Sequence, residues 1–338
     1  MARRRGWRRL GSRGGFRYVD SRGRPIADDG ALERIELLRI PPAWRDVRIS
    51  PRPGAKLQAT GIDSAGRIQY LYHPEFRAHQ EQAKFDKLVR FAEKLPELRT
   101  AMTRHMELEP LEPEWTAAVA VRLINLGWFR IGDERYAKKF RTFGITTLRK
   151  SHVRVRGSKI TFRFRGKHRA MIRTAIIDEE LADAVRLLLS AKGGSRLFRY
   201  RSGDLLCTLR GSSLNDYIQE HMGDEFTAKD FRTWGGTLIA AIALAERGPA
   251  ESEAAAKRAI ATVMRTVGER LGNTPAVARS SYVSPAVVEQ YLDDRTIEDF
   301  RPRHLRVVGA RDIGLDLEEQ ALLSLLRSYR IRRARKAA

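Results

Sequence analysis

The sequence contains a single cysteine, Cys207, so no disulfide can form within the chain. Its seven histidines show no zinc-ligand spacing, either with one another or with this cysteine, and we expect no metal site. No apolar run approaches the roughly 20 residues needed to span a bilayer. The first residues are strongly basic, but no apolar run of secretory length follows them. These absences favour a cytoplasmic protein, without membrane contact, whose fold depends on packing alone.

Acidic residues are also few relative to basic ones: the chain has 41 Asp and Glu but 64 Lys and Arg, which gives a formal net charge of +23. The commonest partner for such a positive field is the phosphate backbone of a nucleic acid. The length of 338 residues and the 42% hydrophobic content suit two globular domains better than one. Charge alone identifies no activity, because an architectural DNA-binding protein would need nothing more.

The chain changes character along its length, and we expect an α+β protein. Short β-rich runs between Pro- and Gly-rich turns give way to helical periodicity. We expect a helix from about residue 79 to 93, interrupted at Pro96. The predicted order is a flexible basic arm, for DNA contact or solubility (1–15), a small β-rich domain (16–95), a mainly helical domain (96–325) and a basic tail (326–338).

A hairpin is predicted inside the helical part. Between residues 153 and 164, apolar side chains alternate with Arg and Lys around a central Gly157. Alternation of this kind is typical of a β-hairpin with one apolar and one basic face.

Tyr282 is expected to lie at a break between helices. A helix should begin at a capping box formed by Thr227 and Asp230, and a later one should end before Gly272. Thr274 then reads as the N-cap of a short helix, which would run towards Tyr282 before proline restarts the next helix. A side chain at such a break is easily exposed.

The chain contains a set of side chains suited to phosphodiester chemistry without a metal. Two Arg side chains can hold the phosphoryl oxygens, a hydroxyl can attack the phosphorus, and an acid can protonate the leaving oxygen. Candidates for these roles occur along the chain in the order Arg130, Lys167, Arg232, Asn273 and Tyr282.

Several short segments resemble the active-site motifs of the poxvirus and bacterial type IB DNA topoisomerases. The resemblance extends over roughly residues 16 to 300. The segments are Phe129-Arg-Ile-Gly, Phe164-Arg-Gly-Lys, Lys229-Asp-Phe-Arg-Thr, Leu271-Gly-Asn and Ser281-Tyr-Val. Upstream, Gly66-Arg-Ile-Gln-Tyr-Leu-Tyr resembles the strand that lays Gln and Tyr side chains against DNA in that family.

The resemblance implies a role for each candidate. Tyr282 would be the nucleophile, Arg130 and Arg232 the phosphate clamp, and Lys167 the general acid. Poxvirus and eukaryotic members carry His where this chain has Asn273. An Asn side chain can donate a hydrogen bond to a non-bridging oxygen but carries no charge.

The resemblance also implies a partner and an architecture. The β-rich domain and the helical catalytic domain would close as a bilobed clamp around duplex DNA. The protein would act as a monomer, without metal, cofactor or ATP, through a 3′-phosphotyrosyl intermediate. Packing within a strand or helix is the alternative reading for the three tyrosines among the expected DNA contacts. These contacts are Arg67, Gln69, Tyr70, Tyr72, Tyr136 and Lys229.

Two other classes of protein could share some of these features. A tyrosine recombinase uses the same covalent chemistry, but it usually places His-x-x-Arg where this chain has Lys229-Asp-Phe-Arg232, and its N-terminal domain is helical. An architectural DNA-binding protein would account for the charge and leave the ordered set of motifs unexplained. The sequence therefore favours the topoisomerase.

Overall fold

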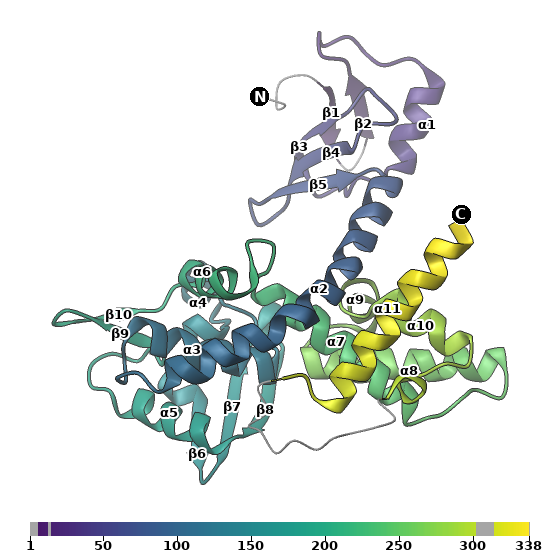
Figure 1. Cartoon of the computed structure of the whole chain (residues 1–338). Helices are drawn as coiled ribbons and strands as arrows, with labels where there is room; N and C mark the ends of the chain where they lie inside the picture. Colours follow the sequence, from purple (N-terminus) through teal and green to yellow (C-terminus); the bar gives the residue numbers. More distant parts are fainter. Residues whose placement is uncertain (1–5, 13–14, 302–313, 338) are drawn as a thin grey trace. The chain divides into compact units, whose positions relative to one another are not determined.

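The chain forms two compact units in a computed structural model that describes residues 6–12, 15–301 and 314–337 (Figure 1). The units are Met1–Lys84 and Phe85–Ala338, and the division falls within the 33-residue helix α2 (Pro74–Met106). The predicted boundary at residue 95 lies further along the same helix. No helix in the described part of the chain combines the length and hydropathy needed to cross a membrane.

The first unit is an antiparallel sheet with one helix, α1 (Asp29–Leu37). Its strand order is β2-β1-β3-β4-β5, and Ile35, Val47 and Ile49 are among the side chains that form its core. The β-rich N-terminal part predicted from sequence is confirmed. The strands are β1 (Trp7–Ser12), β2 (Gly15–Val19), β3 (Arg45–Ile49), β4 (Leu57–Ile62) and β5 (Ile68–Tyr72).

Strand β1 lies where the sequence indicated a flexible arm. Trp7 packs against the core of the first unit, and the Arg9 guanidinium donates to the carbonyl oxygens of Trp44, at 2.7 Å, and Ile40, at 3.2 Å. These hydrogen bonds give the charged side chain of Arg9 a structural role. The basic composition therefore did not predict a flexible arm correctly over β1. Residues 1–5 and 13–14 of the expected arm lie outside the described residues.

The second unit is mainly helical, as predicted, and carries a three-stranded and a two-stranded sheet. Its helices after α2 are α3 (Pro113–Gly127), α4 (Glu134–Phe140), α5 (Glu179–Ser190), α6 (Gly211–Met222), α7 (Ala228–Ala245), α8 (Glu253–Leu271), α9 (Pro275–Ser281), α10 (Pro285–Leu292) and α11 (Leu317–Ala337). Its strands are β6 (Val153–Arg156), β7 (Lys159–Arg165), β8 (Met171–Ile177), β9 (Arg199–Ser202) and β10 (Leu205–Thr208). Short 3-10 turns are η2 (Ile145–Thr147), η3 (Lys150–His152), η4 (Lys167–Arg169) and η5 (Ile297–Phe300).

The expected interruption at Pro96 was wrong, because α2 continues through this residue to Met106. Proline inside a helix removes one backbone hydrogen bond and crowds the preceding turn. Phe91 and Leu95 before the proline and Leu98 after it are all fully buried in one core. Burial on both sides of Pro96 offsets the lost hydrogen bond and keeps the helix continuous.

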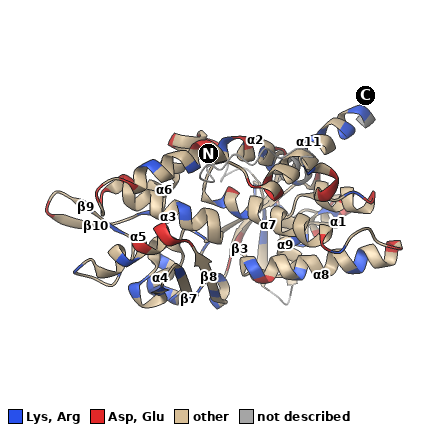
Figure 2. Cartoon of the chain, turned by 60° about the horizontal axis from the view of Figure 1, so that its bottom comes forward, with Lys and Arg blue, Asp and Glu red and all other residues tan. Residues whose placement is uncertain are grey.

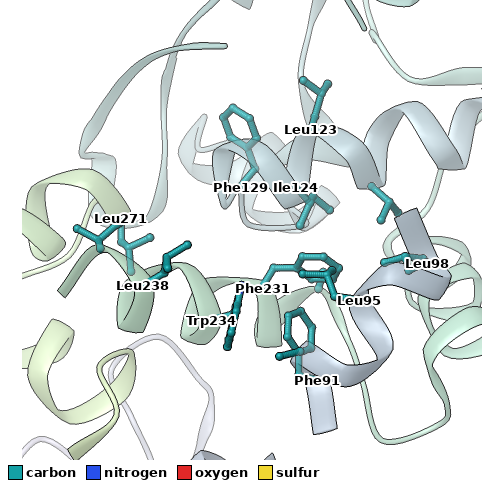
Figure 3. Close-up of a cluster of buried hydrophobic side chains, with 14 of the residues drawn as sticks. Phe91, Leu95, Leu98, Leu123, Ile124, Phe129, Phe231, Trp234, Leu238 and Leu271 are labelled. Atoms are coloured by element: carbon teal, nitrogen blue, oxygen red, sulfur yellow. The ribbon is translucent and has the colours of Figure 1, made fainter. Parts of the chain in front are cut away.

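The centre of this core fixes helix α7 (Figure 3). The Phe91 ring on α2 meets the Phe231 ring on α7 edge to face, with ring centroids 5.0 Å apart, and lies 6.1 Å from the Trp234 indole. Leu123 and Ile124 of α3 belong to the same cluster. Aromatic pairs of this geometry add to the stabilisation from burial, so the core anchors α7 at the turn that carries Arg232.

The three-stranded sheet confirms the predicted hairpin and adds a strand to it. Strands β6 and β7 pair antiparallel, and β8 continues the sheet on the other side of β7. Ile160, Phe162 and Phe164 of β7 face the core, on the side where α5 contacts the sheet (Figure 1). The turn between β7 and β8 contains Lys167.

The helix ends around Tyr282 follow the predicted signals. Thr227 and Asp230 form a capping box at the start of α7, and Gly272 ends α8 in the left-handed conformation at φ 61°. The Thr274 hydroxyl caps α9, Tyr282 lies at the end of that helix, and Ser284 caps α10. Each cap satisfies backbone groups that a helix end leaves unpaired.

Helix α11 is held by a buried carboxylate. Residues 326–337, expected as part of a basic tail, belong to this helix. Glu319 is only 4% exposed, and its carboxylate accepts two hydrogen bonds from Arg99 at 2.7 and 2.8 Å and one from the Trp234 indole at 3.1 Å. This cluster joins α11 to α2 and α7.

We expect Glu319→Gln to lower the free energy of unfolding by about 3 kcal/mol, because it leaves the mostly buried Arg99 without its counter-charge. The measurement is the shift in the urea midpoint followed by far-ultraviolet circular dichroism. Glu318→Gln is the control: its pair with Arg301 is more exposed, so a loss below about 1 kcal/mol is expected. Equal losses in the two variants would contradict the anchoring role of Glu319.

Candidate active site

Arg232 is the most deeply buried of the candidate residues, at 5% exposed. It lies in the first turns of α7, and its guanidinium donates to the carbonyl oxygens of Trp128, at 2.6 Å, and Leu271, at 2.7 Å. Those carbonyls are at the ends of α3 and α8, where helical carbonyls lack intrahelical partners. Two helix ends therefore hold one cation.

The turn at Trp128 depends on close contact with α7. Trp128 ends α3 in the left-handed conformation, at φ 51°, which is unusual for a bulky residue. A Cβ on Gly235 of α7 would collide with the Trp128 indole. The glycine lets the indole lie against α7, and the Trp128 carbonyl then reaches Arg232.

Arg130 follows this turn and reaches the end of α8. Its backbone carbonyl accepts from the Ile145 amide at 2.7 Å, which fixes the segment. Its guanidinium donates to the side-chain carbonyl of Asn273 at 2.5 Å and lies 3.4 Å from the carbonyl oxygen of Gly272. Arg130 and Asn273 thus meet although they are far apart in sequence.

Lys167 lies in the turn between β7 and β8 and is exposed. Ile172 of β8 connects this turn to the end of α8, because Cβ atoms on Gly166 and Gly272 would lie 2.9 and 2.7 Å from its side-chain carbons. Glycine at both positions lets the Ile172 side chain fill the space. The ammonium lies close enough to lower the pKa of Tyr282.

Tyr282 is half-buried at the end of α9, and the centroid of its ring lies 4.9 Å from the Arg232 guanidinium carbon. Burial by itself would raise the pKa of the Tyr282 phenol. The charges of Arg232, Arg130 and Lys167, together with a hydrogen bond from Arg232, outweigh burial and lower this pKa below its ordinary value. The three cations therefore stabilise the phenolate form of Tyr282 relative to that of a tyrosine in water.

Two buried donors in the site have no hydrogen-bond partner among the described residues: Arg232 Nε and Asn273 Nδ2. An unpaired buried donor costs about 1–3 kcal/mol. Burial, with the repulsion of Arg130, lowers the pKa of Arg232 to about 10, so its charge is itself costly in the folded protein. Unsatisfied donors and crowded cations are the features expected of a site that binds an anion.

The predicted DNA-contact residues are spread over both units. In β5, Tyr70 and Tyr72 are exposed, and their rings stack with centroids 6.3 Å apart. Gln69 is on the opposite face of this strand and donates to Asp63, which also pairs with Arg67.

The other two predicted contacts belong to the second unit. Tyr136 on α4 is half-buried and packs on Phe140, with ring centroids 5.5 Å apart. Lys229 is exposed in the first turn of α7, the helix that carries Arg232.

Strands β6 to β8 contain several Lys and Arg residues, coloured blue in Figure 2. All of them are exposed, on the face of the sheet opposite the buried Ile160, Phe162 and Phe164. Arg163 and Arg173 lie opposite each other on β7 and β8. None of the six exposed cations on this face forms an ion pair with another described residue. We call them the sheet-face cations: Arg154, Arg156, Lys159, Arg163, Arg165 and Arg173.

No group of three or more His, Cys, Asp or Glu side chains within the described residues is arranged to hold a metal ion. The candidate site itself offers guanidinium, ammonium, amide and phenol groups. Of these, the cations repel metal ions.

Comparison with known proteins identifies the family to which this chain is similar. The family described as "Eukaryotic DNA topoisomerase I, catalytic core" matches residues 73–301, and "Bacterial DNA topoisomerase IB, N-terminal domain" matches residues 15–63. The chain is 32% identical to DNA topoisomerase 1B of Acanthamoeba polyphaga mimivirus, over 93% of this chain and 92% of that protein. It is 22% identical to DNA topoisomerase 1B of Vaccinia virus (strain Copenhagen), over 81% and 86% of the two chains.

The chain belongs to the type IB DNA topoisomerase family. The family resemblance inferred from sequence is confirmed, as is the α+β fold class. Sequence reasoning did not single out Thr237, which contacts the backbone of Tyr282. A threonine within an apolar helix usually indicates packing, so no signal in the sequence pointed to it.

We expect Arg130→Gln to raise the pKa of Tyr282, because one of the charges that stabilise the phenolate is removed. The measurement is a pH titration of ¹³Cζ-labelled tyrosine by NMR, with Tyr282→Phe used to assign the resonance. Arg130→Lys keeps the charge and should leave the pKa below its ordinary value. An unchanged pKa in Arg130→Gln would contradict electrostatic activation by Arg130.

Proposed function

We propose that this protein relaxes supercoiled duplex DNA by cutting one strand with Tyr282 and resealing it. The observation that carries the proposal is the placement of a phenol with a lowered pKa beside two guanidinium groups. Next to them lie two buried donors that have no hydrogen-bond partner among the described residues. Membership of the type IB DNA topoisomerase family supports the same reaction.

In the proposed cleavage step, Tyr282 first loses its phenolic proton to water, and the resulting phenolate oxygen, stabilised by the neighbouring cations, attacks a backbone phosphorus. The new bond joins phosphorus to the tyrosine oxygen, and the bond from phosphorus to the 5′ oxygen breaks, which leaves a 3′-phosphotyrosyl group. The departing alkoxide is a much stronger base than a phenolate and needs a proton. Lys167 supplies it from its ammonium, and the reverse sequence of steps reseals the strand.

The phosphate would be held by Arg130, Arg232 and Asn273. The Arg232 Nε and Asn273 Nδ2 donors, which no other described residue engages, can bond non-bridging oxygens, which gain negative charge in the transition state. Arg130 orients the Asn273 amide by donating to its carbonyl oxygen, so the amide nitrogen is left for the substrate. An uncharged Asn thus acts through a directed dipole.

One phosphoester replaces another in this reaction, so bond energy is retained and no ATP is needed. While the 3′ end is bound to Tyr282, the free 5′ end can rotate and release supercoils. We further propose that the protein works as a monomer in the cytoplasm, associated with the nucleoid. Its β-rich and helical parts would close as a clamp, with Tyr70, Tyr72, Tyr136 and Lys229 against the duplex.

We expect purified protein to relax supercoiled plasmid in EDTA without ATP, and Tyr282→Phe to abolish relaxation while retaining DNA binding. The phenyl ring keeps the packing and removes only the attacking oxygen. The measurements are gel electrophoresis of the plasmid and a binding titration. Tyr291→Phe, which alters a buried tyrosine on α10, is the control and should retain relaxation. A fully active Tyr282→Phe variant would overturn the proposal, and strand exchange between two DNAs would indicate a recombinase instead.

The sheet-face cations offer a surface for the duplex next to the cleavage site. They follow strands β6 to β8, and β7 leads directly to Lys167. Cross-strand neighbours of like charge destabilise a sheet, and Arg163 lies opposite Arg173. A bound phosphate backbone would remove this repulsion and release its own counterions.

We expect Arg163→Gln combined with Arg173→Gln to reduce the slope of log Kd against log salt by about 2, since each lost phosphate contact accounts for about 0.9. The measurement is duplex binding by fluorescence anisotropy at several salt concentrations. The control is Arg258→Gln combined with Arg265→Gln on α8, which changes the net charge equally. If both pairs change the slope to the same extent, net charge rather than the sheet face is responsible.

A further inference from the structure

Thr237 lies on α7, the helix of Arg232, and its side chain is fully buried. Its hydroxyl oxygen lies 2.8 Å from the Thr233 carbonyl oxygen and 3.1 Å from the Tyr282 carbonyl oxygen. The Ser284 amide donates to the same hydroxyl at 3.1 Å. One side chain therefore contacts the backbone on both sides of the break that carries Tyr282.

These contacts exceed what a threonine inside a helix needs. A helical threonine commonly satisfies its hydroxyl by donating to the carbonyl one turn before it, and Thr233 provides that carbonyl. The hydroxyl still has two lone pairs, and the Ser284 amide uses one of them. The acceptor side of Thr237 is thus turned towards another segment of the chain.

Gly236, the preceding residue, allows α7 to approach Tyr282 closely. A Cβ at this position would lie 2.8 Å from the Tyr282 carbonyl oxygen and 2.9 Å from the Tyr282 Cβ. Both distances are too short for real contacts, and the first involves backbone. Only glycine lets the backbone of Tyr282 lie directly against α7.

The backbone at Tyr282 leaves the helical conformation, at φ −132° and ψ −14°, between the end of α9 and the cap of α10. A residue at such a break is not oriented by a continuing helix. Its position relative to Arg232 is set by what the break packs on, which is α7 at Gly236 and Thr237.

We propose that Thr237, with Gly236, is a positioning residue that sets the distance and direction of the Tyr282 phenol relative to Arg232. The Thr237 hydroxyl contacts the backbone of the nucleophile, and Thr237 lies on α7, the helix that carries Arg232. The same helix therefore positions both Tyr282 and Arg232. The inference rests on the proposed function, because it assigns Thr237 to the cleavage step. A small displacement of a nucleophile can slow a reaction by about 100-fold.

The test compares Thr237→Val, which keeps the shape and removes the hydroxyl, with Thr237→Ser, which keeps the hydroxyl. We expect Val to slow single-turnover cleavage of a duplex by about 10- to 100-fold and to raise the pKa of Tyr282, with duplex Kd unchanged. Thr237→Ser should restore both the rate and the pKa. Thr266→Val is the matched control: its hydroxyl makes the same bond one turn back on α8, to Thr262, and its rate should match wild type.

Gly236→Ala tests the same proposal independently, and it remains informative if Thr237→Val fails to fold. The added methyl group should push Tyr282 away from α7, slow cleavage and raise the Tyr282 pKa while Thr237 is intact. Wild-type cleavage rates in folded Thr237→Val or Gly236→Ala would overturn the inference, as would a Thr237→Ser variant as slow as Val. A wild-type protein that forms no covalent adduct at Tyr282 would instead overturn the proposed function.

Discussion

The site depends on the burial of the Arg232 guanidinium beside the Tyr282 ring. A buried cation loses its hydration, and this loss, together with the repulsion of Arg130, lowers the pKa of Arg232 to about 10. One pKa unit corresponds to about 1.4 kcal/mol, so the charged form costs the folded protein roughly 3 kcal/mol at neutral pH. The carbonyl oxygens of Trp128 and Leu271 make this burial tolerable, because each accepts a hydrogen bond from the guanidinium.

Those two carbonyls explain how distant segments converge. The ends of α3 and α8 expose oxygens that their own helices do not use, and both turn towards one residue of α7. Glycines allow these segments to pack closely, because a Cβ atom at each position would clash with a neighbouring residue. The pairs are Gly235 with Trp128, Gly236 with Tyr282, and Gly272 with Ile172. The hydrophobic core centred on Phe91 and Phe231 also holds α7 in place.

Crowded positive charge gives the site its preference for an anion. Arg130, Lys167 and Arg232 all act on the same phenol, and Arg130 also destabilises the charge of Arg232. A phosphodiester would relieve this repulsion and provide acceptors for the Arg232 Nε and Asn273 Nδ2 donors. Such preorganised donors stabilise developing charge without the reorganisation that water would require.

Much of the local structure followed from the sequence, because its signals act over a few residues. The capping residues Thr227, Thr274 and Ser284 begin their helices, and the left-handed Gly272 ends one, since backbone groups at a helix end must be satisfied nearby. The alternation around Gly157 produced the hairpin for the same local reason. The ordered motifs also identified the candidate residues of the active site.

Tertiary structure decided what local signals could not express. Pro96 remains helical because burial outweighs its local penalty, and the Arg-rich segment at Arg9 forms a strand because its guanidinium finds carbonyls in a later loop. Thr237 gained its contact with Tyr282 only through folding. The sequence by itself determined which chemical groups are present and where helices begin and end. The packing of α3, α7 and α8 decided which groups meet, since burial and long-range hydrogen bonds depend on segments that only folding brings together.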